Sequence, residues 1–156
     1  MPDASSMTMR AEYQGRLSDI PALGAAVEAF CRARGLQPQV AYKLILAMEE
    51  LLTNLAMHGA GANAESEGES PDAAAHRVTI FVSLEGARLV AIYEDGGAAF
   101  DPLSVPPPDF AQPLEDRRVG GLGVHLLRSL MDEVTYARVN GRNRVTLRLT
   151  IPATAF

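Results

Sequence analysis

Apolar residues recur at helical spacing in three segments of the chain. The first segment covers residues 22–34 and follows Ser18 and Pro21, which are typical of a helix start. The second covers residues 38–58, and the third covers residues 122–131. Five residues form the apolar stripe of the second segment: Leu44, Met48, Leu51, Leu52 and Leu55. Apolar residues three or four positions apart share one helix face, so these segments predict three amphipathic helices.

Apolar and polar residues alternate in five shorter segments, as in strands with one buried face. These segments are residues 7–13, 77–84, 88–94, 134–139 and 144–151. Gly86 separates the second from the third, and the Asn140-Gly141 pair, the strongest short hairpin signal in the chain, separates the last two. The order of elements predicts an α+β fold, a two-layer sandwich. Its sheet is antiparallel or mixed and carries the helices on one face.

Two segments lack any periodic pattern. Residues 60–75 consist mainly of Gly, Ala, Ser and Glu, and bury too little apolar surface to offset the entropy of ordering them. We therefore expect a mobile surface insertion there. Residues 100–118 contain five of the ten prolines and predict a long loop. Loops of this length in compact domains are commonly lids or binding loops.

The overall composition narrows the class of protein. A length of 156 residues fits a single domain spanning residues 1–156, and a net charge of −5 argues against direct nucleic-acid binding. The single cysteine, Cys31, excludes an internal disulfide and lies in the apolar pattern of a predicted helix. No apolar run is long enough for a membrane span, and the first residues do not resemble a signal peptide. We expect a cytoplasmic protein that does not contact a membrane.

A file of polar residues runs along the second predicted helix. Glu50, Asn54 and His58 are spaced four apart and therefore share one face, rotated away from the leucine stripe. A carboxylate there could accept a proton or orient a hydroxyl for attack on a phosphate. A neutral amide oxygen is a suitable ligand for Mg²⁺. The alternative is that these residues are simply the solvated side of an amphipathic helix.

Asp95-Gly96-Gly97 follows a predicted buried strand. An aspartate at a strand end could accept a hydrogen bond from an exocyclic amine such as that of adenine, and glycines permit a flat base to approach closely. The alternative is an ordinary turn, because Asp-Gly is a common turn dipeptide.

Gly120, Gly121, Leu122 and Gly123 precede or open the third predicted helix. A helix start presents free N–H groups and a positive dipole end to an anion, and glycines let the backbone approach phosphate oxygens. The spacing is neither a P-loop nor a dinucleotide-binding motif. A flexible joint between loop and helix is the alternative.

Taken together and in this order, the motifs resemble the GHKL (Bergerat-fold) ATP-binding domains of gyrase, histidine kinases and mismatch-repair ATPases. The chain is most similar to the bacterial anti-sigma-factor serine kinases. Glu50-x-x-x-Asn54 resembles the N-box, and Asp95-x-Gly97 resembles the adenine-binding box. Gly121-x-Gly123 resembles the phosphate-binding box, and the resemblance extends over most of the chain.

The resemblance implies a role for each matching residue. Glu50 would be the catalytic base, and Asn54 would contact the nucleotide and ligate Mg²⁺. Asp95 would bind the adenine amine and Gly97 would line the base pocket. Thr146 on the last strand would support Asp95. The segment Gly121, Leu122 and Gly123 would hold the phosphates of ATP or ADP, and residues 100–118 would form the ATP lid.

The same resemblance implies a function. The chain would phosphorylate a serine on a STAS anti-anti-sigma protein with Mg·ATP, sequester a sigma factor, and form a homodimer. Two alternatives stay open. One is a nucleotide-binding regulatory module without kinase activity, although a retained Glu50 favours the kinase. The other is a stand-alone GHKL kinase domain of a different signalling system.

Overall fold

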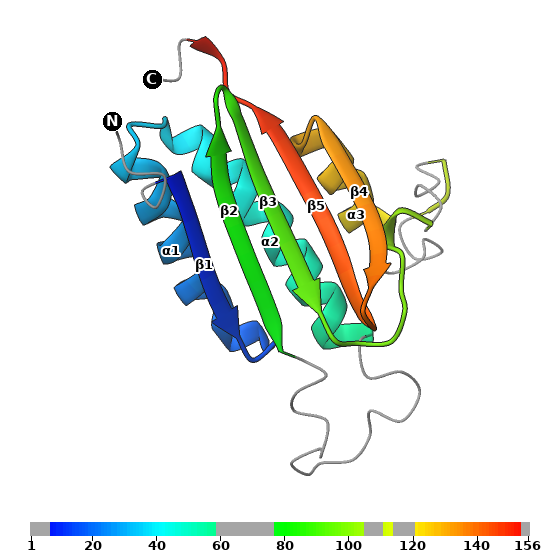
Figure 1. Cartoon of the computed structure of the whole chain (residues 1–156). Helices are drawn as coiled ribbons and strands as arrows, with labels where there is room; N and C mark the ends of the chain where they lie inside the picture. Colours follow the sequence, from blue (N-terminus) through cyan, green and yellow to red (C-terminus); the bar gives the residue numbers. More distant parts are fainter. Residues whose placement is uncertain (1–6, 59–76, 105–110, 114–120, 154–156) are drawn as a thin grey trace.

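The protein folds into one antiparallel sheet with helices on one face, as the computed structural model in Figure 1 shows. The structure describes residues 7–58, 77–104, 111–113 and 121–153. The predicted insertion at residues 60–75 lies outside these ranges, and so does most of the predicted lid at residues 100–118. Within the described ranges, no helix is both long and apolar enough to cross a membrane.

The helices and strands follow the predicted order. The α-helices are α1 (Ile20–Ala33), α2 (Pro38–His58) and α3 (Gly121–Leu130). The described residues also form the short 3₁₀ helices η2 (Leu17–Asp19) and η4 (Pro102–Ser104). The strands are β1 (Thr8–Tyr13), β2 (Val78–Glu85), β3 (Arg88–Asp95), β4 (Glu133–Val139) and β5 (Arg142–Thr150). They form a sheet in the order β1-β2-β3-β5-β4, in which every neighbouring pair is antiparallel. The predicted α+β sandwich is confirmed.

The two hairpin turns form as their sequences require. Asn140 and Gly141 have positive φ values of 51° and 75°, the backbone that a two-residue turn of this kind needs. Gly86 has a φ of 63° in the turn between β2 and β3. Tight turns fix the strand register, and the register decides which side chains face the helices.

The core lies between the sheet and the helices. All five residues of the predicted α2 stripe are buried, and alternate residues of the central strands meet them. On β3 and β5 these inward residues include Tyr93, Asp95, Asn143 and Val145. The opposite face of the sheet carries no described helix (Figure 1). Because α2 crosses behind the end of β3, Asn54 of α2 lies at the same pocket as Asp95 of β3 and Asn143 of β5.

Candidate functional site

An open pocket of about 410 Å³ lies between α2, the end of β3 and the start of β5. Most of its lining is apolar, with three polar side chains among aliphatic and aromatic ones. The lining residues are Leu51, Asn54, Leu55, Tyr93, Asp95, Ala98, Phe100, Pro102, Asn143 and Val145. A mainly apolar cavity with a few convergent polar groups is the usual form of a small-molecule site.

Asp95 is the last residue of β3 and is only 7% exposed. Its Oδ1 atom accepts a hydrogen bond from the Gly97 backbone N–H at 2.9 Å and another from the Asn143 side-chain amide at 2.9 Å. Within the described ranges, the second carboxylate oxygen accepts no hydrogen bond. One oxygen of Asp95 is thus fixed by the protein, and the other is available to a donor in the pocket.

Asn143 fixes this arrangement and was not predicted from the sequence. Besides Asp95, its amide nitrogen donates to the Ala98 carbonyl at 2.9 Å. Its amide oxygen accepts from the Phe100 N–H at 3.2 Å, the Tyr136 hydroxyl at 2.6 Å and the Arg138 guanidinium at 3.0 Å. Acceptors surround the nitrogen and donors surround the oxygen, so only one amide orientation satisfies the network.

The sequence prediction placed the support of Asp95 at Thr146, and the register contradicts it. Asp95 stands opposite Asn143, whereas Thr146 stands opposite Ile92. Residues 143 and 146 are an odd number of positions apart and therefore point to opposite faces of the sheet. Thr146 lies on the face away from the helices. Thr146 was assigned from the family resemblance. Asn143 was missed because the last strand was predicted to begin at residue 144, which left Asn143 in the turn, whereas β5 begins at Arg142.

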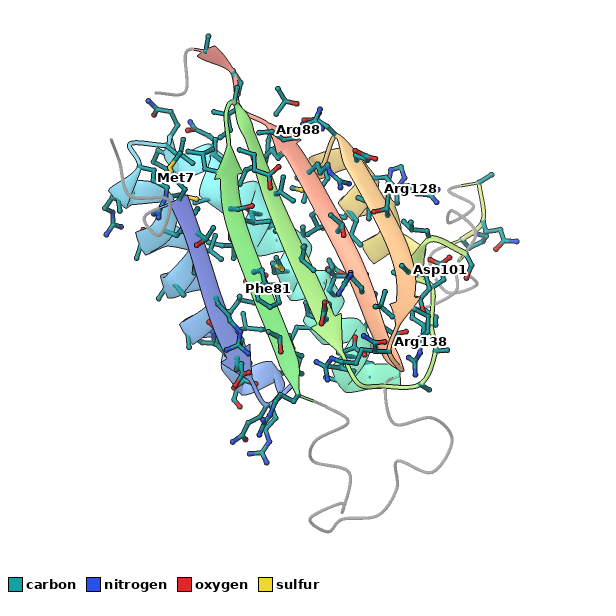
Figure 2. All side chains as sticks on the ribbon, viewed as in Figure 1. Met7, Phe81, Arg88, Asp101, Arg128 and Arg138 are labelled. Carbon is teal, nitrogen blue, oxygen red and sulfur yellow. The ribbon has the colours of Figure 1, made fainter. Side chains whose placement is uncertain are left out.

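The segment after β3 is hydrogen-bonded to side chains of both β4 and α3. Arg138 of β4 donates to the Gly97 carbonyl at 2.9 Å. Asp101 accepts from the Leu103 N–H at 2.8 Å, and Arg128 of α3 donates to the Leu103 carbonyl at 3.0 Å. Figure 2 shows Asp101, Arg128 and Arg138 on the β4 side of the molecule. These contacts place Phe100 and Pro102 at the pocket wall.

Tyr93 links the sheet to α2 next to Asp95. Its hydroxyl donates to the Leu51 carbonyl of α2 at 3.4 Å, and the side chain is 1% exposed. Burial raises the pKa of Tyr93 well above its usual value, and the Asp95 carboxylate adds to the rise. Tyr93 therefore stays a neutral hydrogen-bond donor.

Glu50 and Asn54 lie one turn apart on α2, half-buried rather than solvated. Asn54 lines the pocket with Asp95, whereas Glu50 points toward α3, where its carboxylate lies against Gly123. Burial raises the pKa of Glu50, and the charge of Glu49 raises it further. Among the described residues, no group hydrogen-bonds to the Glu50 carboxylate.

The structure thus brings the predicted residues into two adjoining groups. Asn54 and Asp95 line the pocket. Gly97, predicted to line it, is not among the lining residues; its backbone N–H donates to Asp95 and its carbonyl accepts from Arg138. Glu50 and Gly123 form the second group, at the contact between α2 and α3. Helix α3 begins at Gly121. Gly120 and the side chains of Leu122 and His58 lie outside the described part.

Comparison with known proteins agrees with this geometry. Residues 13–149 match the family described as the histidine kinase-like ATPase domain. The chain is 32% identical over 108 residues to the serine/threonine-protein kinase BtrW of Bordetella bronchiseptica, an alignment that covers 68% of each protein.

Two solved structures share the fold. The first is that of the RsbU and RsbW domains of Rv1364c from Mycobacterium tuberculosis, with a TM-score of 0.59 and 13% identity. That match covers 91% of this chain and 32% of the other. The second is the SiaB-SiaC complex from Pseudomonas aeruginosa, with a TM-score of 0.55 and 16% identity. It covers 92% of this chain and 89% of the other.

Proposed function

Because the chain belongs to the histidine kinase-like ATPase domain family, we propose that it binds ATP or ADP in the pocket beside Asp95. The main support for this proposal is the hydrogen bonding of the Asp95 carboxylate. One oxygen is held by Gly97 and Asn143, and the other is left for a donor. The exocyclic amine of adenine is such a donor, and its hydrogen bond to the largely buried Asp95 carboxylate would add to the affinity for the base.

The remaining pocket surface suits a flat heterocycle. Leu51, Leu55 and Val145 supply aliphatic contacts, and Phe100 and Pro102 form the outer wall. Burying an aromatic base against such groups is favourable at roughly 25 cal/mol per Å² of apolar surface. The phosphates would extend from the base past Asn54 toward the start of α3, where backbone N–H groups point outward.

The residues present fit a magnesium ion carried by the nucleotide. The Asn54 amide lines the pocket, and no described residue hydrogen-bonds to it. The described residues contain no group of three or more His, Cys, Asp or Glu side chains suited to a metal. Mg²⁺ commonly takes one or two protein ligands and completes its shell with phosphate oxygens and water. Bound in this way, the ion would neutralise charge on the phosphates.

Glu50 would act on the attacking group. Its carboxylate would orient the hydroxyl of a protein serine or take the proton from it. The serine oxygen would form a bond to the γ-phosphorus while the bond from that phosphorus to the β-phosphate oxygen breaks and ADP leaves. The raised pKa of Glu50 favours this role, because a more basic carboxylate accepts the proton more readily near neutral pH.

We further propose a STAS anti-anti-sigma protein as the substrate, a sigma factor as the second partner, and a homodimeric state in the cytoplasm. The kinase assignment is supported by the 32% identity to BtrW, whose name describes a serine/threonine-protein kinase. A regulatory module that binds nucleotide without transferring phosphate is the second candidate. The half-buried Glu50 favours the kinase, because no described residue hydrogen-bonds to its carboxylate and partial burial of such a charge costs stability.

Calorimetry with Mg·ATP and Mg·ADP tests the nucleotide site. We expect saturable binding to the wild type, which Asp95→Asn weakens by about 1–3 kcal/mol, or roughly 5- to 150-fold. Ser83→Ala in β2 is a control that should leave the affinity unchanged, because Ser83 pairs with Val90, far along the strand from the pair of Val78 with Asp95. A folded protein that binds neither nucleotide would rule out the proposed site.

A further inference from the structure

Glu50 on α2 and Gly123 on α3 face each other where the two helices meet. A Cβ atom added to Gly123 would overlap the Oε2 atom of Glu50 and lie 3.1 Å from its Cδ atom. The contact extends along the side chain, because the same Cβ position is 3.7 Å from the Cγ atom. Only a residue without a side chain leaves room for the Glu50 carboxylate in its present position.

The backbone gives no other reason for a glycine here. Gly123 is the third residue of α3, and its φ lies outside the left-handed region that favours glycine. Glycine is less favourable in a helix than alanine, by up to about 1 kcal/mol in the helix interior. The glycine therefore destabilises α3 locally, and the space that it leaves for Glu50 is the compensation visible in the structure.

Gly24 in α1 provides a contrast within the same chain. A Cβ atom there would lie 3.7 Å from the Cγ2 atom of Ile45, an ordinary van der Waals distance. Both glycines are helical and neither is fully exposed. The overlap at Gly123 is therefore specific to its position opposite Glu50.

Glu50 has little else to fix its carboxylate. No described residue donates a hydrogen bond to it, and the charge of Glu49 repels it. A flexible side chain without polar partners adopts the position that packing allows. On the α3 side, the backbone at Gly123 limits how far the Glu50 carboxylate can extend.

We propose that Gly123 is a positioning residue for Glu50: the bare backbone of α3 at this point sets where the Glu50 carboxylate lies. This inference rests on the proposed role of Glu50 in phosphoryl transfer. It differs from the role that the family resemblance implies for Gly123, which is to hold the phosphates. A phosphate-holding glycine controls nucleotide affinity, whereas a positioning glycine controls the transfer step.

Gly123→Ala separates these two roles. The end of the Glu50 side chain is free to rotate away from the new methyl group, so the variant should fold. We expect phosphoryl transfer from Mg·ATP to a STAS substrate protein to fall by about 10- to 100-fold, as a displacement of about 1 Å can do. The Kd for Mg·ATP should change by less than about 3-fold. Gly24→Ala is the matched control, and its transfer rate should equal that of the wild type.

A double-mutant cycle with Glu50→Asp sharpens the test. The shorter side chain withdraws the carboxylate from Gly123, so Gly123→Ala should lower transfer by less than about 3-fold in that background. Equal losses in both backgrounds, or a loss of Mg·ATP affinity that accounts for the lost transfer, would overturn the positioning role.

A measurement on the carboxyl itself does not depend on activity. NMR titration of the Glu50 carboxyl, without metal or nucleotide, should show a raised pKa in the wild type and in Gly24→Ala. In Gly123→Ala the displaced group gains solvent, and its pKa should fall toward the ordinary value of about 4.3. An unchanged pKa refutes the positioning role. A fall in pKa without any phosphoryl transfer by the wild type supports the positioning role and refutes the proposed kinase function.

Discussion

The two groups of the site are held in opposite ways. On the sheet side, Asp95 is fixed by hydrogen bonds from Gly97 and Asn143, and Asn143 is itself fixed by Tyr136 and Arg138. On the helix side, Glu50 has no hydrogen-bond donor among the described residues and rests against a glycine. The first arrangement is preorganised for recognition. The second keeps a carboxylate half-buried, basic and available, which is suited to chemistry and costs stability.

The largest expected effect concerns the helix side. Glu50→Gln keeps the size of the side chain and removes its basicity. We expect transfer to the substrate protein to fall by about 10²- to 10⁴-fold, the usual contribution of a positioned general base. The affinity for Mg·ATP should change little, because the sheet side is untouched. Rapid-quench kinetics together with calorimetry would measure both. Equal transfer by Glu50→Gln and the wild type would assign Glu50 a structural role only.

The sheet side should show the reverse pattern. Asn143→Ala removes one donor to Asp95 and leaves Tyr136 and Arg138 without their shared acceptor. Nucleotide affinity should fall by about 1–3 kcal/mol, or roughly 5- to 150-fold, as measured by calorimetry. Thr146→Ala, on the same strand but the other face, is the matched control and should bind as the wild type does. A larger loss of nucleotide affinity in Thr146→Ala than in Asn143→Ala would contradict the β3–β5 register.

The smallest expected effect is on folding stability, which the half-buried Glu50 carboxylate should lower at neutral pH. Its pKa is raised in the folded state by burial first and by Glu49 second. Below the unfolded value of about 4.3 the carboxyl is protonated in both states and costs nothing. As pH rises through the higher folded value, the folded protein must ionise a half-buried group, and stability is lost.

Glu50→Gln removes that penalty. The variant should melt slightly above the wild type at neutral pH, and the difference should vanish below about pH 4. Thermal melts followed by circular dichroism at both pH values would measure it. A melting temperature at neutral pH equal to or lower than that of the wild type would show that the carboxylate is not held at a cost.

Much of the fold follows from local pattern. The leucine stripe of α2 is buried as its spacing requires, and the Asn140-Gly141 turn forms with both residues at positive φ. These features are short-range, because side chains three or four apart share a helix face wherever the helix packs. The order of helices and strands was therefore predictable, and so were Asp95 and Asn54 as pocket residues.

The details of the site depended on contacts between residues far apart in sequence. Asn143 supports Asp95 because β5 begins at Arg142 and pairs in a particular register with β3, and a boundary error of two residues was enough to hide it. The contact between Glu50 and Gly123 needs α2 and α3 to pack side by side, which no periodicity within either helix specifies. The sequence by itself determined which elements form and which residues, such as Glu50, Asn54 and Asp95, are candidates for the chemistry. Only the tertiary structure decided which of those residues touch, because register and helix packing are set by the whole core rather than by any one segment.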